Sequence, residues 1–145
     1  MTVPGDVREV VNAVVAGVPA LADTVSSAGG VNRQLLKGAI GPILSEFGLK
    51  PGSGRGSFAA WEIDYVSSAR AVTVSVQTGR AAANNTALLA LLAAAALPEV
   101  DWAVIVLPHK YKGANAFDAV ANQFLALTRV RGVSLSLQGA FIVGF

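Results

Sequence analysis

The chain has 145 residues, of which 53% are hydrophobic and 14% are charged, and its formal net charge is +2. This length suits one domain with a real core, and a charged share below the usual ~25% favours extensive burial. The absence of cysteine excludes disulfides and thiolate metal sites and favours a reducing compartment.

The start of the chain, MTVPGDVREV, has early acids and no basic region, so we do not expect a signal peptide. No apolar run reaches the ~20 residues that a membrane helix needs. These features predict a soluble, cytoplasmic protein that does not enter a membrane. The small positive charge permits nucleic-acid binding without demonstrating it.

Two helices are predicted near the start of the chain. The spacing of valine and alanine predicts a helix over 6–27, although Gly17 and Pro19 interrupt it. Asn32 is a suitable N-cap for a second helix that runs to about Phe47, because its side chain can accept from the first free N–H groups. These helices make up an N-terminal part over residues 1–48.

The stretch LKPGSGRGSF, residues 49–58, is typical of a flexible connector. Its glycines suit a phosphate-binding loop, but it lacks the Gly-Lys-Ser/Thr ending of a P-loop. The connector leads to a core over residues 59–145, and we expect all three parts to form a single domain, 1–145.

The core opens with WEIDYVSSARAVTVSVQTGR, which predicts two short strands around a turn at 67–70. Because side chains alternate along a strand, Glu62 and Asp64 share one face of the first strand. Ser75 and Gln77 share one face of the second strand in the same way. If the strands pair as a hairpin, we expect Asp64 and Gln77 to lie on adjacent strands with their side chains on one face.

The rest of the core alternates helices and strands. We expect helices over 85–97 and 115–130 and strands over 102–107, 133–137 and 140–144, the last two forming a hairpin. The element order is then α-α-β-β-α-β-α-β-β, which predicts an α/β fold with a mixed sheet flanked by helices.

The hairpin also carries a resemblance to a known family. An isolated aspartate, Asp64, precedes alternating valines, Gln77, a Thr-Gly pair and a helix, and this pattern resembles the core of PD-(D/E)XK nucleases. It is most similar to type II restriction endonucleases in which glutamine or glutamate replaces the final lysine. Asp64 then matches the metal-binding aspartate, Ser75 the acidic position and Gln77 the last position. The resemblance covers roughly 61–145 and implies a restriction-endonuclease-like domain.

The resemblance implies magnesium-dependent hydrolysis of phosphodiester bonds in double-stranded DNA. The Mg²⁺ ligands would be Asp64, the carbonyl of Val76 and Glu62, with Glu46 on the second helix as a further acid. Ser75 is neutral where the family has Glu or Asp, so we expect weak or absent cleavage. The alternative is that the two acids of the hairpin are solvated positions on an exposed strand face.

Five side chains are candidates for DNA contacts: Arg70, Arg80, Lys110, Lys112 and Asn84. The cations can meet phosphates, and the asparagine can read an adenine edge. Each cation is otherwise a solvated surface charge, and the asparagine is otherwise a helix cap.

Two functions are therefore expected from the sequence. The first is a restriction-endonuclease-like, DNA-directed protein, and the second is a non-catalytic assembly or protein-binding module on the same fold. The helix over 85–97 is apolar all round, so it requires cover on more than one side. This favours the second function and predicts a homodimer formed through the helix.

Overall fold

The computed structural model describes residues 2–52 and 63–145. The helices and strands in this part are, in chain order, α1 Gly5–Ala16, α2 Val18–Ala22, α3 Arg33–Ser45, β1 Lys50–Pro51, β2 Tyr65–Ser67, β3 Val72–Val76, α4 Thr86–Ala95, β4 Trp102–Leu107, α5 Ala116–Leu127 and β5 Gly139–Gly144.

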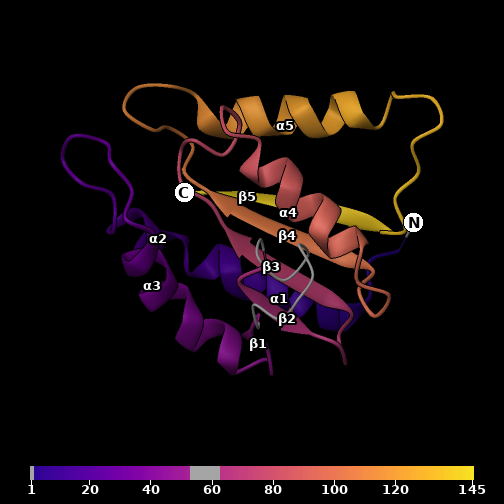
Figure 1. Cartoon of the computed structure of the whole chain (residues 1–145). Coiled ribbons are helices and arrows are strands. Elements are labelled where there is room, and N and C mark those ends of the chain that lie inside the picture. Colours follow the sequence, from indigo (N-terminus) through magenta and orange to yellow (C-terminus); the bar gives the residue numbers. More distant parts are fainter. Residues whose placement is uncertain (1, 53–62) are drawn as a thin grey trace.

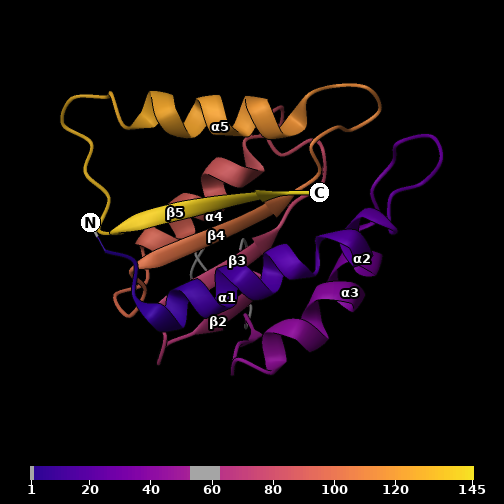
Figure 2. The same ribbon diagram turned by 180° about the vertical axis from the view of Figure 1, so that it is seen from behind.

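The strands form one five-stranded sheet in the order β1-β2-β3-β4-β5. The first three strands pair antiparallel, and β3, β4 and β5 pair parallel. Helices α1 and α3 cover one face of the sheet, and α4 covers the other with α5 beside it (Figures 1 and 2). The α/β fold with a mixed sheet flanked by helices is thus confirmed. Among the described residues, no helix is long and apolar enough to cross a membrane.

The first expected helix is divided into two. Helix α1 ends at Ala16, and α2 begins at Val18 with Pro19 in its first turn, where the missing N–H of proline is tolerated. Part of the expected connector also differs, because Lys50–Pro51 pairs with β2 as the edge strand β1. Residues 53–58 of the connector lie outside the described residues.

The predicted C-terminal hairpin is wrong. Residues 133–137 form no strand, and β5 pairs parallel with β4 along its whole length. Leu135 and Leu137 of this segment pack against the core on the α4 side, but the backbone does not pair with a strand. A helical crossover through α5 separates β4 from β5, and such crossovers return the chain parallel.

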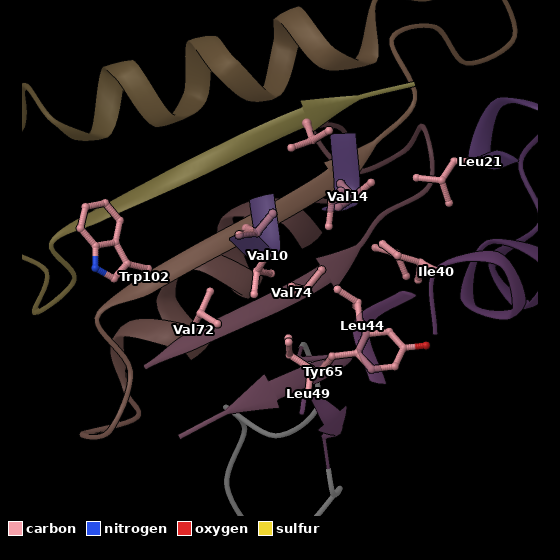
Figure 3. Packing of buried hydrophobic residues seen from close by; sticks show 14 of the residues in the cluster. Val10, Val14, Leu21, Ile40, Leu44, Leu49, Tyr65, Val72, Val74 and Trp102 are labelled. Atoms are coloured by element: carbon pink, nitrogen blue, oxygen red, sulfur yellow. The ribbon is translucent and has the colours of Figure 1, made fainter. Parts of the chain in front are cut away.

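The larger core lies between the sheet and the N-terminal helices (Figure 3). Val7, Val10 and Val14 of α1 are fully buried at helical spacing. They pack in one cluster with the β3 side chains Val72 and Val74. Each such side chain contributes about 1.5–3 kcal/mol when fully buried. Strand β4 is buried at every position, as expected for a strand covered on both faces.

Helix α4 is covered largely within the chain. Half of it is buried, and its only large exposed apolar side chain is Leu89, at 38%. Cover within the chain therefore accounts for half of this helix, and the homodimer through 85–97 stays a prediction. Asn85 precedes the helix with a φ of 57° and makes no side-chain cap. Its Oδ1 instead accepts from Nε2 of Gln123 at 3.3 Å.

The turn between β2 and β3 holds Ala71 in a left-handed conformation, with a φ of 54°. Its N–H donates to the Ser68 carbonyl at 3.2 Å, and its carbonyl accepts from the N–H groups of Asp101 and Trp102 at 2.8 and 3.0 Å. The turn is thus fixed from both sides, although a side chain in this conformation is strained by about 1–2 kcal/mol.

We expect Ala71→Gly to raise the free energy of unfolding by up to about 1 kcal/mol, because glycine adopts this conformation without strain. The greater conformational entropy of glycine in the unfolded chain offsets only part of this stabilisation. Urea unfolding measures the change. The matched control is Ala69→Gly in the same turn, where φ is not positive and glycine should destabilise the protein. A lower stability of Ala71→Gly than of the wild type would contradict the prediction.

Candidate functional site

Asp64 is the only buried acid among the described residues, with 6% of its surface exposed. It sits at the bend before β2, beside the carboxyl end of β3. Its Oδ1 accepts from Nη2 of Arg33 at 2.6 Å and lies 3.7 Å from Nζ of Lys37. Its Oδ2 accepts from the N–H of Val76 at 2.8 Å. Both carboxylate oxygens are therefore occupied.

This carboxylate replaces a backbone acceptor of the sheet. In a regular continuation of β2, Ile63 would lie opposite Val76 and its carbonyl would accept the Val76 N–H. The chain bends at Asp64 instead, so the side chain accepts this N–H, and the Asp64 carbonyl accepts from the N–H of Gly52 at 2.8 Å. A buried N–H without an acceptor costs about 1–3 kcal/mol, so the contact has a structural role.

Helix α3 positions the two cations. Arg33 is its first residue and Lys37 lies one turn later, so both side chains project from the same side. The Asn32 side chain fixes the start of the helix by accepting from two backbone N–H groups, as the sequence predicted. The cation side chains are 45% and 37% exposed, whereas that of Asp64 is 4% exposed. Solvent therefore meets the positive side of this ion pair.

Tyr65 is buried directly beside this pair, with 6% exposure. Its hydroxyl donates to the carbonyl of Lys37 at 3.4 Å. Burial, and secondly the charge of Asp64, raises the pKa of Tyr65 above its ordinary value of 10.0, because both disfavour a phenolate.

The expected polar face of the hairpin is not formed as predicted. Ser75 is 1% exposed and lies opposite Ile105, whose side chain belongs to the core on the α4 side. The carboxylate of Asp64 is turned toward α3, which covers the other face. Gln77 is buried just after β3, and Asp64 precedes β2, so the two do not lie on adjacent strands with one shared face. The bend at Asp64 breaks the alternation on which that prediction rested.

The magnesium ligands expected from the sequence lie only partly within the described residues. No group of three or more His, Cys, Asp or Glu side chains in this part of the chain could hold a metal. Glu46 follows the last residue of α3, about 20 Å from Arg33 at 1.5 Å per helical residue, and so cannot join Asp64. Val76, whose carbonyl was an expected ligand, lies beside Asp64, because its N–H donates to Oδ2 of Asp64. Glu62, the other expected ligand, lies outside the described residues.

Three loops meet at the carboxyl ends of β3 and β4. The loop after β3 carries Arg80 and Asn84, and the loop after β4 carries Lys110 and Lys112. Tyr111 packs so closely on Gly79 that no side chain fits there, which joins these two loops. The N–H of Lys112 donates to the carbonyl of Gly29 at 3.2 Å, and this hydrogen bond joins the loop before α3 to the other two.

With the two cations of α3, these loops form what we call the cationic edge: Arg33, Lys37, Arg80, Lys110 and Lys112. Ligands of α/β sheets commonly bind at the carboxyl ends of parallel strands. Asp64 is the acid that pairs with cations of this edge, through Arg33 and Lys37. Arg33 and Lys37 were not among the residues predicted from the sequence, although Arg and Lys one turn apart on a capped helix are a visible signal.

Arg70 is not part of the cationic edge. It lies in the turn before β3, at the opposite end of that strand. Its Nη1 donates to Oε2 of Glu9 and to the carbonyl of Asp6, both at 2.9 Å, and its Nε donates to the carbonyl of Phe47 at 2.9 Å. Arg70 therefore anchors the turn to α1 and to the end of α3.

Substitution of Asp64 tests its structural role. We expect Asp64→Ala to lower the free energy of unfolding by about 3 kcal/mol, because a buried N–H loses its acceptor and two cations lose their partner. Asp64→Asn keeps one oxygen acceptor and should cost about half as much. Asp118→Ala, at an exposed acid in the first turn of α5, is the control and should cost less than about 1 kcal/mol. Equal stability of Asp64→Ala and the wild type in urea would rule out this role.

The raised pKa of Tyr65 predicts a loss of stability in alkali. Above pH ~10 the unfolded chain releases the phenolic proton while the folded chain retains it, so stability falls as the pH rises toward the folded pKa. Tyr65→Phe lacks the phenol and keeps every other ionisable group of the wild type. Unfolding free energies measured from about pH 9 to 11 should therefore decline more steeply for the wild type. Parallel curves would refute the prediction.

Comparison with known proteins gives no relative: no family model, no curated protein and no solved structure matches the chain.

Proposed function

We propose that the chain binds the phosphodiester backbone of double-stranded DNA through the cationic edge and cleaves it weakly or not at all. The observation that carries this proposal is the exposure of Arg33 and Lys37 around a carboxylate that solvent barely reaches. Lysine and arginine contacts to phosphates supply affinity without reading sequence. Arg80, Lys110 and Lys112 extend the same edge and are exposed.

The proposal keeps the restriction-endonuclease-like relationship, which the spacing of Asp64, Ser75 and Gln77 supports. Weak cleavage follows from the chemistry of the described residues. Magnesium prefers hard anionic oxygens, and metal-assisted hydrolysis needs them around the reacting phosphate. Asp64 supplies one carboxylate, which already has three partners, and Ser75 adds no charge.

The cationic edge sets the expected strength of binding. With five cations, the logarithm of the binding constant should fall with the logarithm of salt concentration with a slope of about −4.5 at most. Contacts of this kind give dissociation constants of about 10⁻⁴–10⁻⁶ M at physiological salt when they read no sequence. We therefore expect binding that is clear at low salt and weak near physiological salt.

Fluorescence anisotropy with a labelled DNA duplex tests the proposal. A double variant, Lys110→Ala with Lys112→Ala, should weaken binding several-fold and reduce the salt slope by about two. The matched control is Arg129→Ala with Arg131→Ala, which removes the same charge just after α5, near the opposite end of the sheet. Equal losses in the two double variants, or no binding of the wild type at low salt, would overturn the proposal.

Cleavage is measured separately with supercoiled plasmid and magnesium. We expect no nicking above background. Robust cutting would mean that an acid outside the described residues completes a metal site, and Glu62→Ala should then abolish it. DNA binding without cutting fits the proposal in full.

The second candidate function is the non-catalytic assembly or protein-binding module. It is favoured by apolar surface on α5 and just beyond it, where Leu125, Val130 and Val133 are 55%, 49% and 47% exposed. Large exposed apolar patches mark interaction sites more often than single exposed residues do.

A further inference from the structure

An apolar groove of about 550 Å³ lies between α5, the segment 133–138 and β5. Leu91, Phe124 and Leu125 contribute from the helices, and Ala140 and Ile142 contribute from β5. Among the residues that the structure describes, no charged side chain lines the groove. It is separate from the cationic edge, which includes none of its lining residues.

One wall of the groove is an open sheet edge. Strand β5 has β4 as its only neighbour in the described sheet. Phe145 turns its backbone toward β4, since its N–H donates to the Leu107 carbonyl at 3.1 Å and its carbonyl accepts from the His109 N–H at 2.7 Å. Alternate residues of a parallel strand face the same neighbour. Ala140, Ile142 and Gly144 therefore direct their N–H and C=O groups outward, toward the open side.

Helix α5 lies past this edge. Both views show α5 beyond β5, on the side away from β4 (Figures 1 and 2). Phe124 is nearly buried against the core, whereas Leu125 next to it is 55% exposed. A strand added beside β5 would lie next to α5, and the side chains that it directs toward α5 would contact Leu125.

We propose that the groove binds an extended, uncharged, apolar segment of a partner protein as a sixth strand beside β5. The outward N–H and C=O groups of β5 are spaced to form hydrogen bonds with the backbone of another extended segment. In strand addition these backbone hydrogen bonds supply the affinity. The lining supplies the selectivity, because a charged side chain facing this groove would lose its hydration without a counter-charge. The row from Ala140 to Gly144 corresponds to a segment of about five or six residues.

A second copy of this chain fits the edge less well than a single strand. In a two-fold dimer, β5 of one protomer would pair with β5 of the other. The second protomer's α5 would then lie over the sheet of the first protomer, on the face that α4 already covers. Neighbouring strands lie about 4.8 Å apart, whereas packed helices need about 8–10 Å, so the helices would crowd. A partner that contributes only a strand avoids this conflict.

The binding test uses a labelled synthetic peptide that reproduces residues 72–78, VTVSVQT, an uncharged strand-forming sequence. We expect saturable binding to the full chain. In a paired strand, every second amide of the peptide faces β5 and the others face away. N-methylation of the amides that face β5 should abolish binding, whereas N-methylation of the others should leave binding unchanged. Absence of saturable binding, or indifference to both methylation patterns, would overturn the proposal.

Protein variants locate the site. Leu125→Glu places a charge in the groove and should weaken peptide binding at least about tenfold. Leu35→Glu is the matched control, because Leu35 on α3 is 56% exposed and does not line the groove. Ile142→Pro removes one outward N–H and should also weaken binding, since an edge strand tolerates proline where the N–H faces solvent. Urea midpoints and DNA binding of Leu125→Glu should match the wild type.

Three outcomes would overturn the assignment. Equal peptide affinity of Leu125→Glu and Leu35→Glu would exclude the groove as the site. Full peptide binding by a folded Ile142→Pro variant would exclude pairing with the β5 edge. Concentration-dependent self-association of the wild type that Leu125→Glu abolishes would make a second copy the occupant instead. Each result is independent of DNA binding at the cationic edge.

Discussion

The buried carboxylate of Asp64 joins three parts of the molecule that are distant in sequence. It holds the first two turns of α3 through Arg33 and Lys37, the bend before β2, and the end of β3 through the N–H of Val76. A charge in a low-dielectric site interacts more strongly with its partners than it would in water. Together with the buried α3 side chains Leu36, Ile40 and Leu44, this contact holds α3 on the sheet and so arranges the cations around the loops.

Local signals in the sequence were sufficient where one short segment determines the outcome. Asn32 predicted the start of α3, because an asparagine side chain satisfies free N–H groups within three residues. The uninterrupted apolar run from Trp102 to Leu107 predicted a strand, and each of its residues is buried. The α/β class followed from the alternation of such segments.

The parts that sequence reasoning missed depend on distant partners. Apolar and polar residues alternate in 133–137 with the period of a strand. This period shows which side chains can pack against the core, but not whether the backbone forms hydrogen bonds with another strand. The bend at Asp64 redirected one side chain, and strict alternation assumes that no bend occurs. Arg33 contacts Asp64 across 31 positions, so neither residue reveals the other by local spacing. The sequence therefore drew attention to Asp64 but not to its partners on α3.

The parallel return of β5 also affects how the protein is made. Val143 packs in the same core cluster as Val7, Val10 and Val14, with Phe141 against it, so the first helix needs the last strand for its cover. A ribosome adds about 5–20 residues per second, so α1 waits on the order of ten seconds before β5 emerges. During that interval its valine stripe is exposed on the nascent chain. Such a stripe is the kind of surface that chaperones bind, and the antiparallel strands β1–β3 can pair long before α1 is fully covered.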